Sequence, residues 1–96
     1  KFNQISAFSG KVISSAESVY YAGEPSKTLI SSYLPAGVNS IEISGQSMVF
    51  NVSTSSGITV VSFPSKVHIV GSIPPTEGIR RIQVVAQDDG ALVVPG

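Results

Sequence analysis

Apolar and polar residues alternate along most of this chain, which is the period-two pattern of β-strands with different surroundings on their two faces. The clearest case is residues 40–44, where Ile41 and Ile43 fall on one side of the predicted strand and Glu42 on the other. Gly or Pro interrupts the alternating runs at short intervals, and Val, Ile, Thr, Tyr and Phe are frequent within them. Both features are typical of strands joined by tight turns.

The alternation and the turn residues together predict about ten short strands. The predicted strands are residues 2–8, 11–15, 18–22, 28–34, 40–44, 48–54, 58–63, 67–70, 79–87 and 92–94. Residues 14–21 are the one candidate for a helix, but their Val-Tyr-Tyr end favours a strand. Hairpin turns are expected at residues 44–47, at residues 54–57 and at Asp89-Gly90, the last with positive φ at both central residues.

Three consecutive strands between Ile41 and Phe63 are expected to form an antiparallel meander at the centre of the core. Val60 and Val61 are adjacent apolar residues, which indicates that the third of these strands is buried on both faces. The predicted core residues are Ile41, Ile43, Met48, Phe50, Val52, Val60, Ile69, Ile82 and Val84.

Two segments of the chain, residues 25–43 and 64–84, follow a similar order of residues. Each begins with Pro-Ser-Lys, continues through an apolar strand to a Leu-Pro or Ile-Pro turn, and restarts after a Gly with alternating apolar residues. The match predicts one three-strand unit used twice, at about 25–54 and 64–94. We therefore predict an all-β fold, an antiparallel β-sandwich or small barrel of short strands, in which the two units form pseudo-symmetric halves.

The composition is that of a single folded domain with an unusually uncharged surface. The 96 residues carry a formal net charge of zero, and 12% of them are charged, about half the usual ~25%. A surface of this kind repels other copies of itself weakly and favours association. We expect residues 1–96 to be one β domain excised from a longer chain, with no electrostatic footprint for nucleic acid and no membrane-spanning segment.

No group of residues carries a recognisable catalytic or metal-binding pattern, so no enzyme activity, cofactor or metal is expected. The chain has no Cys and a single His, His68, which nearly excludes a zinc site. The carboxylates lie on one strand face or in turns, and no pair of them is placed for glycoside hydrolysis. The Asp88-Asp89-Gly90 sequence is explained by a hairpin turn without a calcium ion.

Five residues are candidates for a binding surface: Tyr20, Tyr21, Tyr33, Arg80 and Arg81. The tyrosines offer aromatic faces on which a sugar ring can stack, although Tyr20 and Tyr21 are expected on opposite faces of a strand. The same alternation separates Arg80 from Arg81, so at most one of them is expected on a given binding surface.

Two classes of function remain open. The first is a non-enzymatic structural module of a larger extracellular or virion complex, such as a bacteriophage decoration, fibre or spike protein, acting through protein–protein contacts as a homo-oligomer. The second is an immunoglobulin-like or carbohydrate-binding β-sandwich of an adhesin or secreted enzyme, with a surface glycan as its ligand. Its contacts would lie on the loops at residues 35–40 and 74–79.

Overall fold

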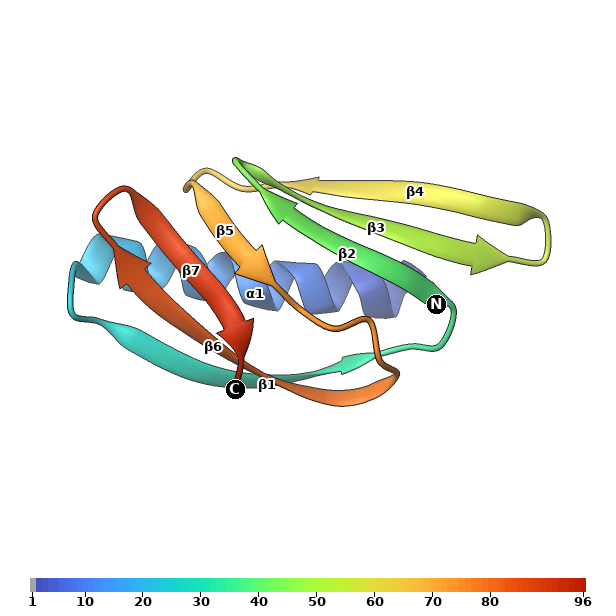
Figure 1. The fold of residues 1–96 in the computed structure, drawn as a ribbon, viewed down its shortest axis with the longest axis horizontal. Helices are drawn as coiled ribbons and strands as arrows, with labels where there is room; N and C mark the ends of the chain where they lie inside the picture. The colour runs from blue at the N-terminus through green and yellow to red at the C-terminus, as the bar shows by residue number, and fades with distance from the viewer. Residues whose placement is uncertain (1) are drawn as a thin grey trace.

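The computed structural model describes residues 2–96, and it combines one long helix with a seven-stranded sheet (Figure 1). The elements are α1 (Phe2–Ala22), β1 (Lys27–Leu34), β2 (Val38–Ser44), β3 (Ser47–Thr54), β4 (Gly57–Pro64), β5 (Ile69–Ser72), β6 (Gly78–Gln87) and β7 (Gly90–Pro95). The strands predicted from residue 28 onward are confirmed, with boundaries that differ by at most two residues. The prediction of strands at 2–8, 11–15 and 18–22 is wrong, because α1 occupies this whole region.

The helix forms because the apolar residues of this region recur every three or four positions, which places them on one side of a helix. The buried stripe consists of Ile5, Phe8, Ser9, Val12, Ala16 and Val19. Short windows of five to seven residues hide this spacing, because in such windows it resembles imperfect alternation. The helix ends at Gly23, which has a φ of 84° and whose N–H donates to the Val19 carbonyl at 3.0 Å.

The sheet is a single mixed sheet that does not close on itself. Its strand order is β1-β6-β7-β5-β2-β3-β4. All neighbouring strands are antiparallel except β5 and β7, which run parallel. The prediction of a mainly β fold is confirmed, but the arrangement is an open sheet packed on a helix, not two stacked sheets or a closed barrel.

The two predicted repeat units are interleaved in this sheet. The strands of the first unit are β1, β2 and β3, and those of the second are β5, β6 and β7. Strand β1 pairs with β6 of the other unit, and β5 pairs with β2. The sheet therefore contains two groups of three, β1-β6-β7 and β5-β2-β3, with the same order and directions. Their registers differ, because Val84 faces Thr28, whereas Ile43, its counterpart in the other unit, faces Gly71, the counterpart of Ser32.

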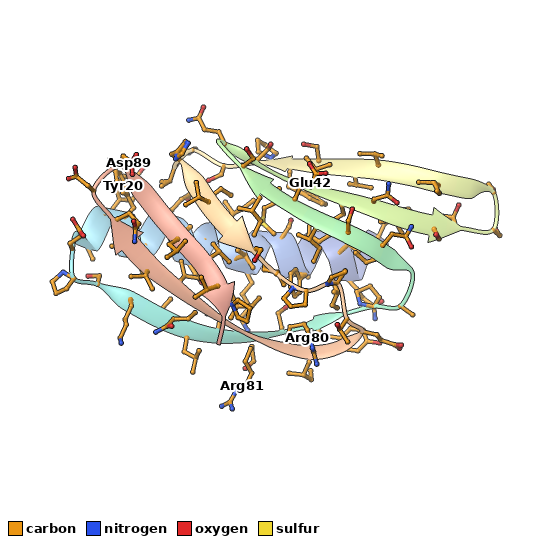
Figure 2. All side chains as sticks on the ribbon, in the orientation of Figure 1. Tyr20, Glu42, Arg80, Arg81 and Asp89 are labelled. Carbon is orange, nitrogen blue, oxygen red and sulfur yellow. The ribbon has the colours of Figure 1, made fainter. Side chains whose placement is uncertain are left out.

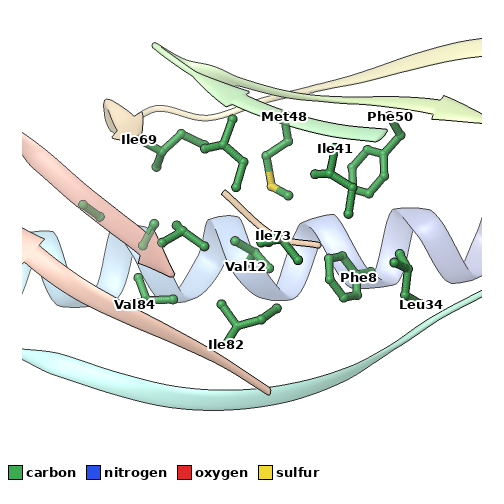
Figure 3. Close-up of a cluster of buried hydrophobic side chains, with 14 of the residues drawn as sticks. Phe8, Val12, Leu34, Ile41, Met48, Phe50, Ile69, Ile73, Ile82 and Val84 are labelled. Atoms are coloured by element: carbon green, nitrogen blue, oxygen red, sulfur yellow. The ribbon is translucent and has the colours of Figure 1, made fainter. Parts of the chain in front are cut away.

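The core lies between α1 and the inner face of the sheet (Figure 3). Phe8 of the helix contacts Phe50 of β3 edge to face, with ring centroids 6.2 Å apart, and Phe50 contacts Phe63 of β4 in the same way at 5.6 Å. Eight of the nine predicted core residues are buried. The exception is Val60, which is 62% exposed, because the face of β4 that carries it has no covering layer.

The parallel pair β5 and β7 depends on a glycine. Gly71 has a φ of 131°, and a Cβ built on it would lie 1.8 Å from the Val93 carbonyl oxygen. Only glycine, which has no Cβ, can adopt this backbone conformation with the neighbouring strand so close. Gly71 therefore allows the two groups of three strands to join into one sheet.

Candidate functional site

The two tyrosines expected to form part of a binding surface, Tyr20 and Tyr21, lie in the last turn of α1. Their rings contact each other with centroids 5.6 Å apart and an angle of 61° between the ring planes. Tyr20 is half-buried and Tyr21 is exposed. The expectation that they lie on opposite faces of a strand is wrong, because the region is helical. Their inclined rings do not form one flat aromatic surface on which a sugar ring stacks.

Of the other three candidates, Arg80 and Arg81 lie at the opposite side of the fold from Tyr20 (Figure 2). Tyr33 is near them in the sheet, because its neighbour Ser32 pairs with Arg80. Tyr33 is exposed on β1 directly opposite Ile79 of β6. Arg80 is half-buried and Arg81 is exposed. Both arginines help to line a shallow hollow of about 260 Å³, whose other walls are Ile73, Pro74, Ile79, Pro95 and Gly96. The five residues thus form two separate groups.

The face of the sheet that points away from α1 carries an apolar patch over β1, β5 and β6. We define the outer patch by its four exposed members, Leu29, Tyr33, Val70 and Ile79. Within residues 2–96 no helix or strand packs over this face. Half-buried Val85, Leu92 and Val94 continue the apolar character between Val70 and Leu29, whereas Ser31 and Arg81 lie between Leu29 and the pair of Tyr33 and Ile79.

A polar strip separates the outer patch from the far end of the sheet. On β2 and β3 the Asn39 amide donates to Asn51 Oδ1 at 2.9 Å and to Ser53 Oγ at 2.8 Å. Beyond this strip, Ile58 and Val60 of β4 are again apolar and exposed, at 68% and 62%. The sheet therefore presents two apolar surfaces that are not continuous with each other.

The two edge strands of the sheet, β1 and β4, differ in how their backbone groups are protected. The Ser26 carbonyl, just before β1, accepts the Ala86 N–H of β6. Backbone groups of successive strand residues point to opposite sides, so those of Lys27, Leu29, Ser31 and Tyr33 point to the free edge. Lys11 of α1 donates its ammonium to the Ser31 carbonyl at 2.6 Å. A lysine at a strand edge is a common device against pairing with another strand.

Strand β4 has no such protection. Ser53 of β3 donates its N–H to the Gly37 carbonyl, on the side of β2. Since backbone groups of successive residues point to opposite sides, those of Met48, Phe50, Val52 and Thr54 point toward β4. Their partners are Phe63, Val61, Thr59 and Gly57. The backbone groups of Ile58, Val60 and Ser62 consequently point away from the sheet. We call these three residues the β4 edge.

The β4 edge also lacks charge. The strand reads Gly-Ile-Thr-Val-Val-Ser-Phe-Pro, with no charged residue and with Pro only at its last position. Native proteins usually place lysine, proline or a bulge on an edge strand. The sequence-based interpretation missed this surface because it placed Val60 in the core. The feature of the sequence that points to an unprotected edge is the absence of any charged residue from residues 43–65.

Side chains that most often carry catalysis or bind metals are scattered in this fold. Among residues 2–96 no group of three or more His, Cys, Asp and Glu is placed to hold a metal ion. His68 is exposed, and its backbone carbonyl accepts the Ala91 N–H at 2.9 Å. No chemical centre comparable to the two apolar surfaces emerges from the described side chains.

Comparison of the chain with models of protein families, with curated proteins and with solved structures gave no match. In the described residues no helix is both long and apolar enough to cross a membrane. The functional assignment therefore depends on the fold and its surfaces.

Proposed function

We propose that this domain is a non-enzymatic assembly module that acts through protein–protein contacts with copies of itself. The observation that carries the proposal is the pair of uncovered apolar surfaces, the outer patch and the β4 edge. Contiguous exposed apolar side chains on a folded domain are typical of interaction sites. An extracellular or virion complex of the fibre, spike or decoration type is the setting in which we place the module.

The charge of the chain supports association between identical copies. The formal net charge is zero at pH 7, so two copies approach without long-range repulsion. Strand β4 contains no charged residue, whereas Arg81 is exposed on the outer patch, opposite Ser31 and between Leu29 and Tyr33 along the strands. Burial of the β4 edge consequently does not require the desolvation of a charged group.

A glycan-binding function has less support from the geometry. Tyr20 and Tyr21 are tilted against each other, and Tyr33 lies on the other side of the molecule. The hollow beside Arg80 and Arg81 is apolar along most of its wall and offers few polar groups for sugar hydroxyls. We therefore keep a single proposed function.

The test is the solution mass measured by light scattering and sedimentation equilibrium over a concentration series up to about 1 mM. We expect the mass to rise from the monomer value of 10.0 kDa to that of a defined oligomer, because contact with another copy buries exposed apolar surface. A monomer at every concentration would refute association between identical copies and with it the proposed function.

A further inference from the structure

We infer that the β4 edge is a homodimerisation site, at which two copies add their β4 strands to one another and extend the sheet across a twofold axis. The inference rests on the proposed function, and it names the surface and the partner with which association between copies begins. It concerns the edge of the sheet rather than the outer patch.

The backbone geometry of the edge requires an extended partner. Ile58, Val60 and Ser62 present N–H and C=O groups outward, and within residues 2–96 no strand lies beyond β4. A row of outward-facing groups at a strand edge is a template for one more strand. The hairpin of β3 and β4 also projects past the end of α1 in Figure 1. The approach to this edge is thus open.

The sequence of β4 fits a second copy of itself in antiparallel register. If the twofold axis passes through Val60, this residue faces the partner's Val60, and Ile58 faces the partner's Ser62. All three outward-facing residues then meet outward-facing residues, which gives about six backbone hydrogen bonds. No charged residue of β4 meets a like charge, because the strand contains none.

The structure also indicates why β4, rather than β1, is the pairing edge. Both strands have eight residues. Strand β1 begins with Lys27, and the Lys11 ammonium occupies its Ser31 carbonyl. A strand added to β1 would displace this hydrogen bond and bury two positive charges near the junction. Self-pairing at β4 avoids both costs, so we expect a closed dimer, not an open chain of sheets.

The occupant is a second copy and not an unrelated peptide, because the match of length, register and neutrality is internal to this chain. Acidic or basic peptides would meet no opposite charge on β4. A junction of two strands is at the small end of protein interfaces, below about 1,200 Å² in total. We therefore expect a dissociation constant in the range of roughly micromolar to millimolar.

The first experiment compares the wild type with Val60→Lys and Val60→Pro by sedimentation equilibrium up to about 1 mM. Lysine introduces two facing charges at the twofold axis, and proline removes an N–H that bonds only the partner. We expect at least a tenfold increase in the dimer dissociation constant for each variant. Val60→Thr, which is uncharged and β-branched, should dimerise within about threefold of the wild type.

Tyr21→Lys is the matched control outside both apolar surfaces, because Tyr21 and Val60 are both highly exposed, at 71% and 62%. It should dimerise like the wild type. Circular dichroism and thermal unfolding confirm that each variant is folded. If Val60→Lys and Val60→Pro fold and still dimerise, the β4 inference is wrong while the proposed function stands. If the wild type is monomeric throughout, both are wrong.

The register has its own test, because the chain contains no natural cysteine. Val60→Cys places two thiols across the twofold axis, whereas Ile58→Cys places them about four residues apart along the strands, roughly 13 Å. A short bismaleimide should therefore crosslink the first variant efficiently and the second poorly. Equal crosslinking of both variants, or efficient crosslinking of Ile79→Cys instead, would overturn the proposed register.

Discussion

The contact of Phe8 and Phe50 joins the helix to the sheet, and truncation of Phe50 tests the whole arrangement. Phe50 is fully buried and its ring contacts both Phe8 and Phe63. Replacement of a buried Phe by Ala costs about 3–5 kcal/mol through lost burial and the cavity that remains. Because Phe50 lies between two other rings that cannot both collapse into the space, we expect Phe50→Ala to lie in the upper half of this range.

The free energy of unfolding is measured by urea denaturation followed by circular dichroism, with the slope checked against that of the wild type. A loss below about 1 kcal/mol would show that Phe50 is not in the core. The helix contact is isolated by a double-mutant cycle of Phe8→Leu and Phe50→Leu. An edge-to-face pair predicts a coupling of about 0.5–1.5 kcal/mol. Effects that add within about 0.3 kcal/mol would refute the packing of α1 against β3.

Two glycines allow further predictions by the same denaturation assay. Gly10→Ala should stabilise the domain by roughly 0.5–1 kcal/mol, because Gly10 is in α1 and its added Cβ would meet nothing within 4 Å. A destabilising effect would contradict an exposed helical position. Gly71→Ala should cost roughly 3 kcal/mol or more, because the added Cβ would overlap the Val93 carbonyl at a positive φ. A loss below about 1 kcal/mol would contradict the parallel pairing of β5 and β7.

Local sequence patterns were sufficient to predict the strands after residue 26 and, except for β4, which of their side chains face the core. Alternation is a local property, and a strand with one buried face must show it wherever it lies in a sheet. Ile41 and Ile43, for example, were assigned to the core from five residues of sequence and are buried. Hairpins are local in the same sense, and the three predicted turns all join neighbouring antiparallel strands.

The errors came from features that extend beyond a short window. The stripe of α1 differs clearly from a period of two only over a window of about 11–18 residues, so shorter windows place Ile5 and Val12 in strands. The type of the last hairpin was also wrong, because its turn residues are Asp88 and Asp89, and neither has a positive φ. Gly90 instead lies beside the His68 backbone, where a Cβ would be 2.0 Å from the carbonyl oxygen.

The candidate site was less predictable than the fold, because edge positions are set by long-range pairing. Nothing in residues 57–64 indicates whether a further strand lies beyond them. The local pattern therefore predicts Val60 in the core, although residues 43–65 contain no charged residue. Likewise, the separation of Tyr20 from Tyr33 depends on α1, where the local pattern predicts strands.

The interleaving of β1–β3 with β5–β7 has a consequence for how the domain acquires its structure. Strand β1 finds its neighbour, β6, only after about fifty further residues have been synthesised, and β7 enters between β6 and β5. Pairing over such distances in sequence is slow, and it exposes incomplete sheets for longer. A proteolytic cut near residue 65 would leave two fragments, each holding strands whose partners are in the other. We expect neither fragment to fold alone, whereas the two mixed together should reconstitute the sheet.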